Sequence, residues 1–193
     1  MEPQTPPLQT TPLPPTWPGC GLTWLKSSLQ DPAVLTRLLS TYSAPDLEAL
    51  CALWELNGRV DQLPPPCARN GGPWMQWVVM GGRGAGKTRT GAEWVRGLAL
   101  GLPGFASKPV GRIALIGETM ADVRDVMVEG VSGLLSVHGR ERPVWEPSRR
   151  RLQWSNGAMA QCFSAEDPES LRGPQFECAW LDELAKWRHD QEC

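Results

Sequence analysis

An α/β fold with a mostly parallel sheet is the fold class that this sequence predicts, on three observations. Short apolar runs alternate with segments of helical periodicity from Trp77 onward. A glycine-rich loop separates the first apolar run from the first of these helices. The last apolar run, Phe176 to Leu181, ends in two adjacent carboxylates. This alternation argues for strands joined by helices, with one hairpin inserted.

The first half of this core contains two predicted strands and one helix. Trp77 to Met80 (WVVM) and Arg112 to Ile116 (RIALI) are short apolar runs of the kind that form buried strands. A helix is expected from Lys87 to about Leu100. Together they give a strand, a glycine-rich turn, a helix and a second strand.

The second half contains a helix and a hairpin. Thr119 and Asp122 have the spacing of a capping box, and apolar residues keep helical spacing from there to Leu135. Arg150 to Trp154 and Ala158 to Phe163 alternate around an Asn-Gly pair, a strong hairpin signal. We therefore expect this hairpin to join the parallel sheet.

Proline content and helix signals divide the region before the core. Seven prolines among the first 18 residues indicate a disordered leader. Asp31-Pro32 is a helix start, and a second start is expected between Ser43 and Asp46. The predicted segments are a leader (1–21), a helical lead-in (22–62), a linker (63–73) and the core (74–193).

Composition excludes some classes of protein and favours others. No run of about 18 apolar residues exists, so no membrane span is expected, and no secretory signal is visible. The six cysteines form no C-x-x-C pair, which favours free thiols in a reducing cytoplasm. From Gln76 onward, 15 basic residues balance 15 acidic ones, so bulk charge gives no support for nucleic-acid binding. A local arginine-rich stretch, 140–151, is either a DNA-phosphate contact or a solvated hairpin flank.

The glycine-rich loop fits the phosphate-binding pattern G-x-x-x-x-G-K-[ST] without exception. Its residues are Gly81, Gly82, Arg83, Gly84, Ala85, Gly86, Lys87 and Thr88. Glycines let the backbone wrap a triphosphate with its amides pointing inward, and the helix N-terminus adds partial positive charge. Lys87 is predicted to reach the β- and γ-phosphates of ATP, and the Thr88 hydroxyl to ligate Mg²⁺.

The carboxylates that end the last strand are the second half of this predicted site. A buried strand that terminates in Asp182 and Glu183 is unusual unless those charges meet a cation. We expect Asp182 to hold Mg²⁺ and Glu183 to polarise the attacking water. The fold prediction therefore becomes a P-loop nucleoside triphosphatase of the additional-strand, catalytic-glutamate type.

An arginine could complete the site. Arg83 lies inside the loop, where it could brace the γ-phosphate as an arginine finger acting within the chain. Arg172, shortly before the carboxylate strand, could face the same phosphates. Each could instead be a loop or turn residue, and the sequence does not choose between the two arginines.

Three stretches resemble the ATPase domain of large terminase subunits, above all those of phage-like gene transfer agents and related prophages. They are GGRGAGKTRTGAEWVRGLA (81–99), ALIGETMADVRDVMVEGVSGLL (114–135) and FSAEDPESLRGPQFECAWLDELAKW (163–187). ALWELNGRVDQLPP, upstream, is similar to the family's lead-in, where a glutamine contributes to an adenine-side motif. Gln62 is the matching position. The resemblance covers roughly residues 45–188.

The resemblance implies an ATP-driven motor that packages double-stranded DNA into a phage-like capsid in the host bacterium's cytoplasm. It also implies an oligomeric ring of this chain, a portal protein, a small terminase subunit and a following nuclease domain. The family's coupling motif, on a strand between the loop strand and the carboxylate strand, is absent before the sequence ends at Cys193. We therefore expect a core that is incomplete at its C-terminus, with a sheet that lacks its middle strand between the loop strand and the carboxylate strand. The alternatives are another P-loop enzyme, either a helicase-like translocase or a kinase, and a nucleotide-binding fragment without turnover.

Overall fold

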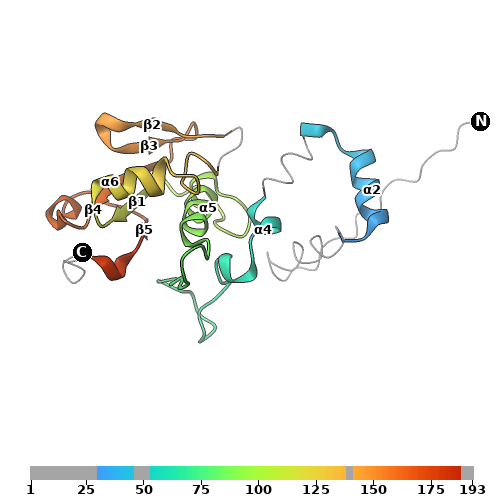
Figure 1. The fold of residues 1–193 in the computed structure, drawn as a ribbon, viewed down its shortest axis with the longest axis horizontal. Helices are drawn as coiled ribbons and strands as arrows, with labels where there is room; N and C mark the ends of the chain where they lie inside the picture. Colours follow the sequence, from blue (N-terminus) through green and yellow to red (C-terminus); the bar gives the residue numbers. More distant parts are fainter. Residues whose placement is uncertain (1–29, 46–52, 138–140, 188–193) are drawn as a thin grey trace, which may run out of the picture.

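The computed structural model describes residues 30–45, 53–137 and 141–187 (Figure 1). The predicted leader (1–21) lies outside these residues, as do most of the second lead-in helix (46–52) and Arg140. Described helices in the first half are α2 (Pro32–Thr41), α4 (Trp54–Asn57), the 3-10 turn η1 (Val60–Gln62) and α5 (Lys87–Leu100). Those of the second half are α6 (Met120–Asp122), the π-helical turn η2 (Val123–Val128), and three 3-10 turns, η3 (Pro147–Arg149), η4 (Pro168–Leu171) and η5 (Leu184–Lys186).

A five-stranded sheet forms the centre of the fold. Its strands are β1 (Arg112–Gly117), β2 (Val144–Glu146), β3 (Arg151–Gln153), β4 (Met159–Ser164) and β5 (Cys178–Leu181), in the order β2-β3-β4-β1-β5. β1 pairs in parallel with both β4 and β5, whereas β2–β3 and β3–β4 are antiparallel. The α/β prediction is confirmed, but the sheet is mixed rather than mostly parallel. The reason is that β2, which has no clear sequence signal, adds a second antiparallel pairing beyond the predicted hairpin.

The two faces of the sheet are covered by different parts of the chain. On one face, α5 and η2 pack on β1, β3 and β4, with Val95, Met127 and Leu134 almost fully buried. On the other face a smaller cluster joins Ile116, Phe163 and Trp187. The second cluster brings the segment after β5 under the carboxyl ends of the parallel strands.

The predicted turns and caps are largely confirmed. The Thr119 hydroxyl accepts from the Asp122 amide at 3.1 Å and an Asp122 carboxylate oxygen accepts from the Thr119 amide at 3.2 Å, which is the expected capping box. The hairpin turns at Asn156, whose carbonyl side-chain oxygen accepts from the Ala158 amide at 3.0 Å. At α2, Asp31 caps the Ala33 amide at 2.8 Å as predicted, although this helix stands apart from the sheet (Figure 1).

The buried strand expected at Trp77 to Met80 is wrong. The segment is not a strand, and Val78 and Met80 are 74% and 87% exposed. An apolar run becomes a strand only where it shares hydrogen bonds with a sheet edge, and this run pairs with none of the five described strands. The run therefore reaches the glycine-rich loop as unpaired chain.

The helix expected from Thr119 to about Leu135 is wrong in its second half. Regular structure ends at Val128, after which the Leu134 amide donates to the Met127 carbonyl at 2.8 Å. The chain turns back because Gly130 and Gly133 have no side chains. A Cβ at Gly133 would lie 2.8 Å from the Val128 carbonyl oxygen.

In the part of the chain that the structure describes, no helix combines the length and apolar character needed to cross a membrane. The cysteines among these residues, Cys67, Cys162 and Cys178, are free thiols. Burial raises the pKa of both the Cys162 and Cys178 thiols to about 12, so neither ionises near neutral pH.

Candidate functional site

The glycine-rich loop leads directly into helix α5, which begins at Lys87. Gly84 and Gly86 have φ of +79° and +83°, values that side-chain-bearing residues rarely adopt. Gly86 is the N-cap residue and supplies no side-chain oxygen to the first turn. The amides at this helix start are therefore uncapped by their own N-cap residue, as an anion-binding helix start requires.

Lys87 lies between the loop and the carboxylates. Its Nζ donates to the carbonyl oxygens of Gly81 at 3.0 Å and Gly82 at 3.3 Å. The same Nζ lies 3.8 Å from Oε1 of Glu183, which follows β5 at the other end of the core sequence. The fold thus brings together the two motifs that the sequence analysis had assigned to one site.

Asp182 is anchored at the end of β5. Its amide donates to the Ile116 carbonyl at 3.0 Å, and its carbonyl accepts from the Trp187 indole at 3.1 Å. Burial raises the pKa of the Asp182 carboxyl above its ordinary value, and the adjacent negative charge of Glu183 raises it further. Such a carboxylate is stabilised by a cation placed against it.

Glu183 has a backbone conformation that is uncommon for its residue type. Its φ of +53° lies in the left-handed region, and it precedes the 3-10 turn η5. The Glu183 side chain is 46% exposed and forms ion pairs with two lysines. Its Oε1 lies 3.8 Å from Nζ of Lys87, and its Oε2 lies 3.8 Å from Nζ of Lys186. This backbone turn accompanies the contact of Glu183 with Lys87, while the Asp182 amide stays hydrogen-bonded to β1.

The two candidate arginines differ in their surroundings. Arg83 is exposed within the loop, and no ion pair joins it to another described residue. Arg172 is also exposed and forms a surface ion pair with Glu169 at 2.8 Å, next to the turn η4. Nothing in these contacts brings Arg172 to the loop, whereas Arg83 is part of it.

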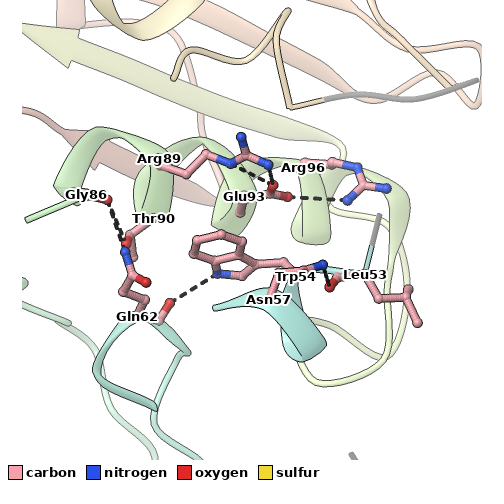
Figure 2. A network of polar contacts seen from close by, with 9 residues as sticks. All are labelled: Leu53, Trp54, Asn57, Gln62, Gly86, Arg89, Thr90, Glu93 and Arg96. Carbon is pink, nitrogen blue, oxygen red and sulfur yellow. Dashed lines mark hydrogen bonds and ion pairs between the residues drawn. The ribbon is translucent and has the colours of Figure 1, made fainter. Parts of the chain in front are cut away.

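Gln62, the predicted adenine-side residue, lies against the loop (Figure 2). Its Nε2 donates to the Gly86 carbonyl at a long 3.5 Å, and the residue is only 6% exposed. Sequence reasoning missed Arg59, whose guanidinium donates to the Ala85 carbonyl at 2.9 Å. It also missed Trp187, because no local pattern shows which indole will return to the strand end.

These observations define an α/β protein in which a glycine-rich loop and a strand-end carboxylate pair meet at one edge of a mixed sheet. The profile of the family described as terminase large subunit, T4likevirus-type, N-terminal, matches residues 78–193. The chain belongs to this family. No significant match was found among curated proteins or among solved structures.

Proposed function

We propose that this chain is the ATP-hydrolysing part of a terminase large subunit, which drives double-stranded DNA into a phage-like capsid. One observation carries the proposal: Lys87 of the glycine-rich loop lies 3.8 Å from Glu183, beside Asp182. Motor ATPases need a phosphate cradle and a water-activating carboxylate within reach of one nucleotide. Membership of the terminase family supports the packaging role.

Each side chain has a distinct part in this proposal. Loop amides and Lys87 bind the triphosphate, and Lys87 then exchanges its present carbonyl contacts with Gly81 and Gly82 for phosphate oxygens. Glu183 accepts a proton from the attacking water and orients it. Arg83, exposed in the loop, is the residue we assign to bracing the γ-phosphate.

The residues present fit a magnesium nucleotide. Mg²⁺ prefers hard oxygen ligands and keeps several from water and phosphate, so a protein supplies only one or two. The Asp182 carboxylate and the Thr88 hydroxyl are the hard oxygen donors that we assign to Mg²⁺. Among the described residues, no cluster of three or more His, Cys, Asp or Glu side chains could hold a metal ion. When bound, Mg²⁺ neutralises charge that develops on the phosphates.

Terminase membership also indicates the wider assembly. We propose that the working form is a homo-oligomeric ring in the cytoplasm of a bacterial host, contacting a portal protein, a small terminase subunit and double-stranded DNA. These partners follow from the family alone.

The division of labour between the carboxylates tests the proposal. Glu183→Gln should bind Mg-ATP normally but hydrolyse it far more slowly, because only the proton acceptor is lost. Asp182→Asn should lose Mg²⁺-dependent affinity. Glu169→Gln, an exposed carboxylate paired with Arg172, is the matched control and should behave as the parent.

Binding measured by calorimetry and turnover measured by phosphate release separate the outcomes. Normal turnover in Glu183→Gln would remove Glu183 from the water-activating role and favour the kinase alternative. Binding without turnover in the parent would favour a nucleotide-binding protein that does not hydrolyse ATP.

A further inference from the structure

The described part of the arginine-rich stretch, residues 141–151, lies at the edge of the sheet farthest from the proposed nucleotide site. It forms the outer strand β2, turns through η3 and enters β3, whereas Glu183 follows β5 at the opposite edge (Figure 1). These residues include four arginines and two glutamates, in a chain whose net charge is −2. Positive charge is therefore concentrated on a hairpin that the proposed ATP chemistry does not use.

Glu146 compensates two of these arginines and leaves a third without a partner. Its Oε2 lies 3.1 Å from Nε of Arg151 and 3.7 Å from Nη1 of Arg149. Arg150, between them, is exposed, and its guanidinium forms no ion pair or hydrogen bond with another residue that the structure describes. The turn therefore presents one uncompensated positive charge to solvent, beside the loosely paired Arg149.

Arg150 also has a backbone conformation that suits other residue types better. Its φ of +52° lies in the left-handed region, which glycine or asparagine adopts with less strain. Arg150 is the C-cap residue of η3, and its carbonyl accepts from the Cys162 amide of β4 at 2.8 Å. This bond fixes where the arginine stands. An exposed charge in strained backbone, without a partner inside the protein, indicates a partner outside it.

A groove of about 380 Å³ opens beside this turn. Its wall includes Arg149 and Arg150 together with the side chain of Gln161 from β4. Guanidinium groups and a side-chain amide are all donors for phosphate oxygens. Glu166 and Asp167 also line the groove and repel an anion, so the arginine side of the groove is the side open to a phosphate.

We propose that Arg149 and Arg150 bind a phosphate group of the DNA backbone, at a site separate from the nucleotide loop. Arginine matches two phosphate oxygens with two parallel N–H donors, and neutralising a DNA phosphate releases its condensed cations. A hairpin at the sheet edge is accessible to a long polymer, and terminase membership supports a DNA-packaging role. The contact carries no base preference, because it is made to the backbone. The inference rests on the proposed function for its ligand but not on ATP hydrolysis.

Fluorescence anisotropy of a labelled random-sequence duplex, titrated with the full chain at several salt concentrations, tests the site. Each neutralised phosphate contributes about 0.9 to the slope of log affinity against log salt, which is about eightfold in affinity at about 0.1 M salt and about twofold at about 0.4 M. Arg150→Gly and Arg150→Asn should each lose these factors, and the slope should fall by about one. Arg150→Lys keeps the charge and should keep the parent slope. Arg69→Ala is the control, because Arg69 is exposed but lies outside the hairpin and the groove.

Urea denaturation separates a binding role for Arg150 from a structural one. Glycine and asparagine both tolerate the left-handed conformation, so the two neutral variants should keep or raise the parent's urea midpoint while they lose DNA affinity. Asp167→Asn should strengthen DNA binding, because it removes a repelling charge from the groove. Parent-like DNA affinity in both neutral variants, or a fall in urea midpoint in both, would overturn the site. Equal competition by polyglutamate of matched charge would also overturn it, because the arginines would then bind carboxylates of an acidic protein.

Phosphate release by the parent distinguishes this inference from the proposed function. A parent that hydrolyses ATP but does not bind the duplex would overturn the inference and leave the ATPase assignment in place. A parent that binds the duplex through Arg150 but does not hydrolyse ATP would overturn the ATPase assignment and support this site.

Discussion

Gly91, in the middle of helix α5, is a position where two effects of opposite sign compete. Glycine inside a helix normally costs about 1 kcal/mol relative to alanine, so Gly91→Ala would ordinarily be stabilising. Here, however, a Cβ would overlap the Trp180 indole of β5. Trp180 is only 7% exposed and belongs to the main core cluster, so the ring has little freedom to move away.

Overpacking of a buried site typically costs 1–3 kcal/mol, and the overlap with several ring atoms places this one near about 3 kcal/mol. Subtracting the helix gain of about 1 kcal/mol leaves Gly91→Ala destabilised by about 2 kcal/mol. For a chain of this size that corresponds to a fall in Tm of about 4–8 °C. The substitution adds only one methyl group, but the sign of the resulting stability change reports directly on how closely α5 approaches β5.

Urea denaturation followed by circular dichroism measures the change, and Trp180→Leu supplies the matched background. With the smaller side chain in place, Gly91→Ala should become neutral or stabilising, giving a coupling energy of about 2 kcal/mol or more. If Gly91→Ala stabilises the parent, α5 does not pack on β5 as closely as described. The geometry that brings Lys87 to Glu183 would then also be wrong.

Three further predictions concern residues around the site. Gly86→Ala should lower ATP affinity and speed amide exchange in the loop. The substitution forces a left-handed φ of +83° on alanine, and its Cβ would displace the Gln62 side chain. An ATP affinity equal to that of the parent would contradict this prediction. Burial raises the pKa of Glu55 above its ordinary value of 4.5, so the folded chain binds that proton more tightly and loses stability as pH rises from 4.5. Glu55→Gln should abolish this loss, and its advantage in urea midpoint over the parent should grow from pH 4.5 to 7. Trp187→Phe should cost about 1 kcal/mol in the same assay through its bond to the Asp182 carbonyl, and no change would show that the indole does not anchor the strand end.

Local chemistry explains which elements could be predicted from sequence. The loop, the Thr119 capping box and the Asn-Gly hairpin each depend on a few adjacent residues whose bonds are fixed by backbone geometry. Strand β1 could also be predicted from the sequence, because a central parallel strand that is buried on both faces is continuously apolar.

Long-range pairing explains what could not be predicted. Trp77 to Met80 is as apolar as β1, yet no sheet edge among the described residues pairs with it, so the same composition gives exposed chain. Strand β2 is the opposite case: Val144–Glu146 has no clear strand pattern in the sequence, but it becomes a strand because it pairs with the edge of β3. Arg59 and Trp187 were missed for the same reason: each acts on a partner that the fold, not the sequence, brings near.

Calorimetric titration of Mg-ATP against two lysine variants tests most directly whether the loop and the carboxylates form one nucleotide site. The Nζ atoms of Lys87 and Lys186 each lie 3.8 Å from a carboxylate oxygen of Glu183, but only Lys87 belongs to the loop. Lys87→Ala should weaken ATP binding by about 1.5–3 kcal/mol, roughly ten- to 150-fold, through loss of a charge-assisted phosphate contact. Lys186→Ala should bind ATP as the parent does. Equal ATP affinity in Lys87→Ala and the parent would contradict the assignment of the site.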